Sequence, residues 1–416
     1  MAFSADEAVE VAAAGHPVIL LRRETTPEDI HGMKVAEGIL TELGGMTSHA
    51  AVVARGMGVC AITGCGSLRV DINEGIARSE NGVEIRRGDT ITLDGATGDV
   101  MLGDVAKIEA STSDDIQTLL SWADKYRRLK VRANAETPDD VRKARELGAE
   151  GIGLCRTEHM FFESERIDLM RAMILAEDKR ERKQVLARLG EFQQADILEL
   201  YREMDGLPVT IRLLDPPLHE FLPHTEDDIQ ALATRLENPV ESLRRAIDDL
   251  QEVNPMLGFR GCRLSVVYPE ITKMQIRAII GAALEAKDQG LNPFPEIMIP
   301  LVVNVREVRL VGEIIDRSIR KLLKEKSVSL RYKVGTMMET PLACLGADRL
   351  AGAVEFMSFG TNDLTQMSYG FSRDDAGRFI PQYLDAKLIE NDPFVSLEQR
   401  AVGRLMRMAI QESRAV

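Results

Sequence analysis

Short apolar runs alternate with longer amphipathic stretches through residues 130–416 of the chain. Apolar periodicity of the helical kind fills the intervening segments, for example residues 137–148 and 227–251. This alternation predicts a parallel sheet, and seven such units favour an incomplete (β/α)8 barrel, with a doubly wound sheet as the alternative. The seven candidate strands are residues 131–135, 151–155, 209–214, 256–261 (the weakest), 297–303, 332–339 and 356–360.

The first 102 residues have a different pattern, in which short β-type runs are separated by glycine-rich turns and one helical stretch. Residues 16–22 and 89–102 contain the clearest strand candidates. This pattern predicts a compact α+β domain. Residues 103–129 combine a Ser/Thr/Asp-rich patch with an amphipathic helix, which indicates a helical connector to the barrel.

The last predicted helix of the chain, residues 397–412, would lead into an eighth barrel strand. The sequence stops at Val416 before such a strand. A parallel barrel that lacks one strand has an open edge on each side of the gap. The pattern therefore predicts that the barrel is truncated at its C-terminal end.

Composition narrows the class of protein. A formal net charge of -14 disfavours non-specific binding to nucleic acid or to an anionic membrane. No apolar run approaches the roughly 18 residues that span a bilayer, and the first 20 residues do not resemble a signal peptide. Five scattered cysteines without a CxxC pair indicate neither a disulfide framework nor a zinc site. A reducing cytoplasm fits this composition best.

The candidate functional residues lie at the C-terminal ends of the predicted barrel strands, which is where barrel enzymes carry their catalytic side chains. Arginine forks suit phosphate and carboxylate oxygens, and carboxylates from neighbouring strands suit Mg²⁺. Together these groups predict a phosphoryl-transfer site. Any one of these arginines taken alone is better explained as a surface ion pair. The candidates are Arg156, Arg212, Arg260, Glu339, Asn362 and Asp363.

His49 lies in the stretch GGMTSHAAVVARG, between a glycine pair and the start of a predicted helix. A helix N-terminus, with Thr47 or Ser48 as its cap, keeps an imidazole neutral and nucleophilic and stabilises a phosphate anion. The alternative is a polar residue near a helix cap, with no role in chemistry. Arg55, six residues along the helix, is predicted to face away from His49.

Five motifs resemble those of the phosphoenolpyruvate-utilising enzymes. GGMTSHAAVVARGMG is similar to their phosphohistidine signature, and four further motifs are similar to their phosphoenolpyruvate barrel. Within that family Met46, the segment 210–223 and the long helical insertion before residue 254 resemble the pyruvate phosphate dikinases. Phosphoenolpyruvate synthase and enzyme I of the sugar phosphotransferase system are the alternatives. The barrel motifs are GLCRTEHMFF, NPMLGFRGCRL, GTMMETP and SFGTNDLTQ.

The resemblance implies roles for individual residues. His49 would carry the phosphoryl group, and Arg156 and Arg212 would bind it. Glu339 and Asp363 would hold Mg²⁺, and Thr47 matches a threonine that is phosphorylated to switch off some dikinases, although a helix cap explains it equally well. Phosphoenolpyruvate or pyruvate would bind in a loop made of Gly360, Thr361, Asn362 and Asp363, with Arg260 and Arg373 as further contacts.

The resemblance also implies parts that these 416 residues do not match. Dikinases carry an ATP-binding half before the phosphohistidine domain, and their eighth barrel strand bears a cysteine that protonates the pyruvate enolate. The sequence is therefore expected to be a C-terminal portion of such an enzyme, a cytoplasmic homodimer through the barrel when intact. Two alternatives stay open: a Mg²⁺-dependent enolate-forming aldolase or lyase in which His49 has no role, and an inactive fragment.

Overall fold

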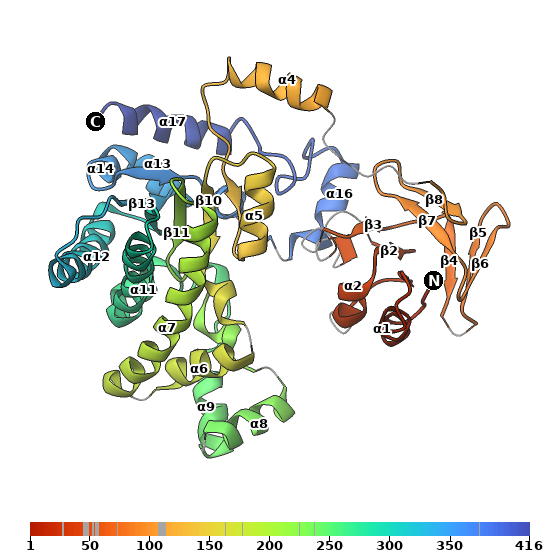
Figure 1. Cartoon of the computed structure of the whole chain (residues 1–416), viewed down its shortest axis with the longest axis horizontal. Helices are drawn as coiled ribbons and strands as arrows, with labels where there is room; N and C mark the ends of the chain where they lie inside the picture. Colours follow the sequence, from red (N-terminus) through yellow and green to blue (C-terminus); the bar gives the residue numbers. More distant parts are fainter. Residues whose placement is uncertain are drawn as a thin grey trace. The chain divides into compact units, whose positions relative to one another are not determined.

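The structure is a computed structural model of the 416-residue chain (Figure 1). It divides into two compact units, Met1–Tyr126 and Arg127–Val416, which are described separately. The structure describes all residues except 27–28, 45–49, 52–53, 55–57, 73, 107–113, 163, 177, 224, 237 and 374.

The first unit combines three small sheets with helices. Its parallel sheet has the order β1-β2-β3, and the strands β4 to β6 and β7 to β8 form two antiparallel sheets. Leu20 of β1 packs with the helical residues Ala8 and Met33, whereas the next residue, Leu21, packs with Leu68 of β4. The elements are α1 (Ala5–Ala13), β1 (Ile19–Arg22), α2 (Ile30–Val35), β2 (Gly38–Thr41), β3 (Cys60–Ile62), β4 (Leu68–Asp71), β5 (Ile76–Ser79), β6 (Glu84–Arg86), β7 (Ile91–Asp94), β8 (Asp99–Leu102) and α4 (Asp114–Asp124).

The second unit contains a parallel sheet of six strands whose spatial order follows the chain. The sheet is curled into an open half-barrel, so the prediction of an α/β fold with an incomplete barrel is confirmed. A doubly wound sheet would reverse its strand order at one point, and this sheet does not. The strands are β9 (Ala133–Asn134), β10 (Ile152–Arg156), β11 (Pro208–Arg212), β12 (Phe294–Ile299), β13 (Lys333–Met337) and β14 (Phe356–Ser358).

Helices follow the strands and cover the sheet. Side-chain caps define the starts of some of them: Asn304 and Glu307 form a capping box at α12, and Thr137 and Asp140 form one at α5. The helices are α5 (Pro138–Glu146), α6 (Ser164–Leu175), α7 (Lys179–Glu203), α8 (Glu226–Leu236), α9 (Val240–Leu250), α10 (Cys262–Val267), α11 (Pro269–Asp288), α12 (Val305–Lys326), α13 (Pro341–Leu345), α14 (Ala347–Ala351), α15 (Thr361–Tyr369), α16 (Ile380–Asp385) and α17 (Val402–Arg414), with short 3₁₀ helices η2 (Thr157–Phe161), η3 (Leu218–Phe221), η4 (Pro255–Leu257) and η5 (Ala376–Arg378).

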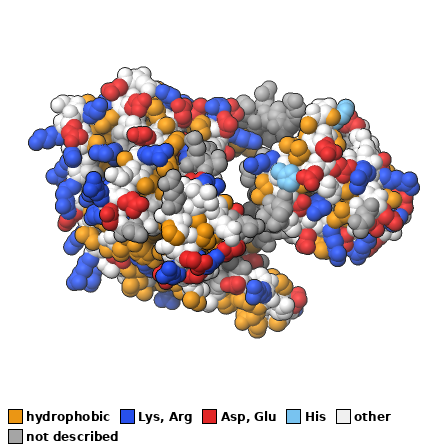
Figure 2. All heavy atoms as spheres, turned by 90° about the horizontal axis from the view of Figure 1, so that it is seen from below, with side chains coloured by type: hydrophobic (Ala, Val, Ile, Leu, Met, Phe, Trp, Pro, Cys, Tyr) orange, Lys and Arg blue, Asp and Glu red, His pale blue; other side chains and the backbone are white. Residues whose placement is uncertain are grey.

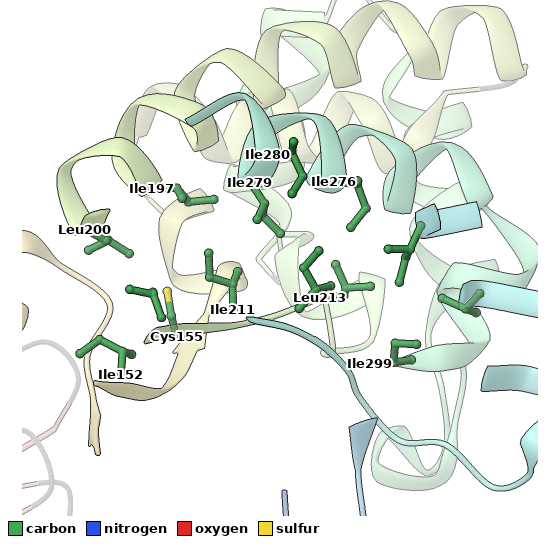
Figure 3. Packing of buried hydrophobic residues seen from close by; sticks show 14 of the residues in the cluster. Ile152, Cys155, Ile197, Leu200, Ile211, Leu213, Ile276, Ile279, Ile280 and Ile299 are labelled. Carbon is green, nitrogen blue, oxygen red and sulfur yellow. The ribbon is translucent and has the colours of Figure 1, made fainter. Parts of the chain in front are cut away.

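The main core lies between the sheet and the helices α7 and α11. Figure 3 shows Cys155 of β10 and Ile211 of β11 beneath Ile197 of α7 and Ile279 of α11. All four side chains are fully buried. Because this packing fixes the strands to the helices, it also fixes the loops at the C-terminal ends of the strands.

One strand prediction is wrong. Residues 256–261 form no strand: Pro255–Leu257 is the 3₁₀ helix η4, and the sheet has six strands among the described residues rather than seven. Pro255 lacks the amide hydrogen that a strand would donate, and Gly261 has a φ of 59°, which lies outside the β region. The segment therefore crosses the end of the sheet as an irregular loop.

The surface carries charge of both signs. On the face drawn in Figure 2, acidic and basic side chains are interspersed among apolar ones. Among the helices of the described residues, none combines the length and apolar character needed to cross a membrane.

Candidate functional site

A cavity of about 480 Å³ opens at the C-terminal ends of the barrel strands. Arg156, Arg212 and Met298 are register partners on three adjacent strands, and all three line this cavity. Because register partners in a parallel sheet point to the same face, the side chains of Arg156 and Arg212 leave the sheet on the same side. The cavity is also lined by Asn134, Gly153, Leu154, Asp215, Met256, Arg260, Met337, Glu339, Ser358, Phe359, Gly360, Thr361, Asn362, Asp363, Gln366 and Arg373.

Two of the arginines are buried and share one carboxylate. Oδ2 of Asp215 forms an ion pair with Nη1 of Arg212 at 2.8 Å and accepts a hydrogen bond from Nη2 of Arg260 at 2.7 Å. Arg212 also donates to Glu158, and Arg260 donates to Oδ1 of Asp363 at 3.3 Å. Burial disfavours the charge of Arg212, but Asp215 and Glu158 more than offset this and raise its pKa. The cluster therefore keeps fixed positive charge inside the cavity wall.

Glu339 is the most deeply buried acid of the site. It lies two residues beyond β13 and is fully inaccessible to solvent. Its Oε1 accepts from the N–H of Leu301 at 2.6 Å, whereas its Oε2 has no hydrogen-bond partner among the described residues. Burial, reinforced by the charges of Asp215 and Asp363, raises the pKa of Glu339 to about 8. A buried carboxylate oxygen without a donor has a lone pair free for a cation.

Asp363 and its neighbours begin a helix at the cavity. Gly360 precedes α15, and Asp363 lies in the first turn of that helix. Burial raises the pKa of Asp363, and the charges of Arg260 and Arg212 oppose this rise. The first backbone N–H groups of a helix have no intrahelical acceptor, so this helix start suits a carboxylate or phosphate.

The predicted barrel residues are brought together by the fold. Among the described residues, however, no group of three His, Cys, Asp or Glu side chains is arranged as a metal site. The predicted pair of carboxylates would need ligands from the substrate and water. The residues that line the same cavity are Arg156, Arg212, Arg260, Glu339, Gly360, Thr361, Asn362, Asp363 and Arg373.

Sequence reasoning missed two acids of the site. Asp215 and Glu158 are both buried and both pair with Arg212. The sequence feature that could have pointed to Asp215 is its position three residues after Arg212, within the segment 210–223. Glu158 follows Arg156 by two residues, in the motif that ends β10. Tertiary contacts determine which residues form ion pairs. The positions of residues at the ends of predicted strands do not reveal those contacts.

The residue predicted to carry the phosphoryl group, His49, and the residues discussed with it lie outside the described part of the chain. His49, Thr47, Ser48, Met46 and Arg55 all belong to segments that the structure does not describe. Gly44, just before them, has a φ of 116°, a backbone conformation that favours glycine.

Comparisons with known proteins agree with these motifs. Residues 110–416 match the family model described as PEP-utilising enzyme, PEP-binding domain, and residues 14–98 match PEP-utilising enzyme, mobile domain. PEP is phosphoenolpyruvate.

Several curated relatives are named pyruvate, phosphate dikinase. The protein of Clostridium symbiosum is 51% identical, over 99% of this chain and 47% of that protein. The protein of Rhizobium meliloti is 52% identical, over 99% and 46%. Pyruvate, phosphate dikinase 1, chloroplastic, of Arabidopsis thaliana is 51% identical, over 99% and 43%. The chain thus spans about half the length of the curated relatives it matches. With one family model covering most of its length, the chain belongs to the PEP-utilising enzymes.

Proposed function

We propose that this chain transfers a phosphoryl group between phosphoenolpyruvate and His49, as one part of the pyruvate phosphate dikinase reaction. That reaction converts ATP, phosphate and pyruvate into AMP, diphosphate and phosphoenolpyruvate. The observation that carries the proposal is the cavity lined by Arg156, Arg212 and Arg260 together with Glu339, whose Oε2 has no hydrogen-bond partner among the described residues. Family membership and the dikinase names of the relatives support it.

In this proposal the arginines bind the transferring group. Arg156 and Arg212 are adjacent on neighbouring strands, so two guanidinium forks can contact the three phosphoryl oxygens. Glu158 and Asp215 hold Arg212 in a fixed orientation before the ligand arrives. Such preorganised charge stabilises a transition state without rearrangement. The substrate carboxylate would bind at the start of α15, in the loop of Gly360, Thr361, Asn362 and Asp363.

The residues at this position also fit a hard divalent cation. Oε2 of Glu339 and Oδ1 of Asp215 are buried oxygens without a hydrogen-bond partner among the described residues. Glu339 and Asp363 would hold Mg²⁺, with the substrate and water as further ligands. Bound there, Mg²⁺ would neutralise charge on the transferring phosphoryl group.

The chemical step is a transfer to nitrogen. The bond between phosphorus and the enol oxygen breaks, and a bond forms between phosphorus and an imidazole nitrogen of His49. The electron pair stays on the enolate, which takes up a proton at carbon to become pyruvate. The same proposal includes three further points. Thr47 is a regulatory phosphorylation site, and the protein is cytoplasmic. The protein also forms a homodimer, which rests on the resemblance alone.

The test of this function is phosphorylation of the chain by radiolabelled phosphoenolpyruvate in the presence of Mg²⁺. We expect one acid-labile phosphate on wild-type protein and none on His49→Ala. His31→Ala is the matched control, because His31 is an exposed histidine of the same unit, paired with Asp6. Equal labelling of wild type and His49→Ala would rule out the carrier role. Binding of phosphoenolpyruvate without labelling of either protein would favour an enolate-forming barrel.

A further inference from the structure

Arg156 is held by a carboxylate outside the acids already described. Its Nη1 donates to Oε1 of Glu136 at 2.8 Å. Among the described residues, Glu136 is the side chain paired with this guanidinium. Arg156 remains about one-third exposed, unlike the buried Arg212 and Arg260. Its position at the cavity therefore depends on Glu136 more than on packing.

Glu136 is in turn held from its other side. Nδ1 of His159 lies 3.4 Å from Oε2 of Glu136, so the carboxylate bridges a histidine and an arginine. Glu136 follows β9, Arg156 ends β10, and His159 lies in η2. Three segments of chain thus meet through one carboxylate at the rim of the cavity.

The helix that carries His159 has a rigid attachment. The hydroxyl of Thr157, its first residue, donates to the carbonyl oxygen of Arg212 at 2.9 Å, and Gln275 donates to that hydroxyl at 2.9 Å. Both side chains are buried. On the solvent side, the His159 ring lies 6.4 Å from the Phe162 ring, which stacks on the buried Phe221. His159 is therefore a fixed point against which Glu136 is oriented.

We propose that Glu136 is a positioning residue that fixes the Arg156 guanidinium at the cavity, and that the imidazolium form of His159 holds Glu136 in place. This inference rests on the proposed role of Arg156 in binding the phosphoryl group. Neither Glu136 nor His159 lines the cavity, so they act through Arg156 rather than on the ligand.

The charges around His159 give the arrangement a pH dependence. The hydrogen bond to Glu136 raises the pKa of His159 against the effect of burial, Glu158 raises it further, and Arg156 lowers it. Burial raises the pKa of Glu136, but His159 and Arg156 more than offset this, so the net pKa is lowered. With His159 protonated, the group of His159, Glu136 and Arg156 carries one net positive charge. Once His159 is neutral, Glu136 cancels the charge that Arg156 offers to an anion.

The direction of the effect follows from these charges. Since the pKa of His159 is raised, the imidazolium persists to higher pH than in a free histidine, and the stronger anion affinity belongs to the low-pH side. Affinity should fall as pH rises through this pKa, by about fivefold, the scale of a partly exposed ion pair. Sulfate is the suitable probe because its charge is constant near neutral pH, whereas phosphate itself titrates there.

The experiment is calorimetric titration of the whole chain with sulfate across this pH range, with phosphoenolpyruvate and Mg²⁺ as a second ligand. We expect His159→Gln to bind sulfate as weakly as high-pH wild type, with a flat profile. Glu136→Gln should shift the midpoint to lower pH, because the carboxylate that raises the pKa of His159 is gone. Glu136→Asp, which keeps the charge, should restore part of the profile, and its thermal unfolding reports whether the fold is intact.

Two controls separate a specific effect from a general one. His31→Gln removes a histidine paired with a carboxylate, Asp6, and Glu150→Gln removes a carboxylate paired with Arg127. Both should leave the sulfate profile unchanged. A wild-type profile in His159→Gln would overturn the inference.

A further variant distinguishes this failure from failure of the proposed function. If Arg156→Ala weakens sulfate binding but His159→Gln keeps the wild-type profile, only the positioning role is wrong. If Arg156→Ala binds both ligands as tightly as wild type, Arg156 is no ligand residue, and the proposed role and this inference fail together.

Discussion

The backbone N–H of Leu301 donates to the buried carboxylate of Glu339 at 2.6 Å, and Leu301 does so from a left-handed conformation with a φ of 51°. A non-glycine residue in this region carries about 1 to 2 kcal/mol of strain. The Leu301 side chain is itself buried, and its Cβ would lie 2.7 Å from a Cβ added at Gly261. Leu301 is thus a strained residue whose backbone amide orients Glu339 in the cavity.

This strain predicts an unusual order of stability at position 301. Leu301→Ala should lose roughly 2 to 4 kcal/mol through loss of buried packing, and it keeps the strain. Leu301→Gly loses the same packing but releases the strain, so it should be at least as stable as Leu301→Ala. Urea unfolding measures both. At Leu213, which is buried but has no positive φ, the usual order should hold, with glycine the less stable by about 0.5 to 1 kcal/mol. The usual order at both positions would contradict the account of Leu301.

The absence of a side chain at Gly360 leaves room for Glu339. We therefore predict that substitution of Gly360 weakens ligand binding. A Cβ at position 360 would lie 2.2 Å from Oε2 and 2.7 Å from Cβ of Glu339. Because Glu339 is enclosed, it must shift, and we expect Gly360→Ala to weaken Mg²⁺-dependent phosphoenolpyruvate binding by roughly 10- to 100-fold, the scale of a 1 Å misplacement. Calorimetry measures the loss.

The matched control is Gly312→Ala, in the middle of α12. A Cβ there meets no atom within 4 Å, so binding should be unchanged and stability should rise by about 0.5 to 1 kcal/mol. If Gly360→Ala bound as tightly as Gly312→Ala, the close approach to Glu339 would have no consequence for the site.

The two carboxylates proposed to hold Mg²⁺ should act together. Glu339→Gln and Asp363→Asn each remove a carboxylate oxygen that would ligate the cation, so each should weaken Mg²⁺ and phosphoenolpyruvate binding in parallel. The loss should be at least the roughly 10- to 100-fold found for residues that merely orient metal ligands. Titration of one ligand at fixed concentrations of the other measures the coupling. Glu313→Gln, an exposed carboxylate of α12, is the control. Unchanged Mg²⁺-dependent binding in either site variant would mark that residue as structural.

The sequence predicted the sheet well because buried parallel strands are continuous apolar runs. Residues 151–155 and 209–214 are largely apolar runs, and they overlap β10 and β11. Residues 256–261 are apolar apart from Arg260, but their backbone is set by Pro255 and by the approach of Gly261 to Leu301 and Asp215. Only tertiary contact reveals that this segment is a loop.

For the site, strand ends predicted which arginines and acids meet, because the C-terminal ends of parallel strands share one edge. What they could not predict is how those groups pair. Asp215 bridges Arg212 and Arg260, and Glu136 joins Arg156 to His159. These partners come from loops, whose path depends on packing rather than on periodicity.

Glu296 is another buried acid, and it is the centre of an ion-pair network that does not line the cavity. It lies on β12 between its register partners Thr210 and Lys333. The Thr210 hydroxyl donates to Oε2 at 2.9 Å, Arg132 pairs with the same carboxylate, and Nζ of Lys333 is 3.7 Å from Oε1. Burial raises the pKa of Glu296, but Arg132 and Thr210 outweigh this, and the net pKa is lowered.

This network predicts a pH-dependent loss of stability in Glu296→Gln. Since the pKa of Glu296 is lower in the folded chain than in the unfolded chain, its ionised form stabilises the fold above the ordinary glutamate pKa of about 4.3, and this contribution is lost as pH falls through the lowered value. At neutral pH we expect Glu296→Gln to lose about 2 to 4 kcal/mol, because the Arg132 and Lys333 charges then lack their partner. The difference from wild type should shrink on acidification, as measured by urea unfolding at several pH values. Glu313→Gln, whose exposed pair with Arg317 contributes little, should show a small difference throughout. A Glu296→Gln difference that stayed constant down to acidic pH would mean that the variant loses packing or hydrogen bonding alone, and that the charge of Glu296 does not stabilise the half-barrel.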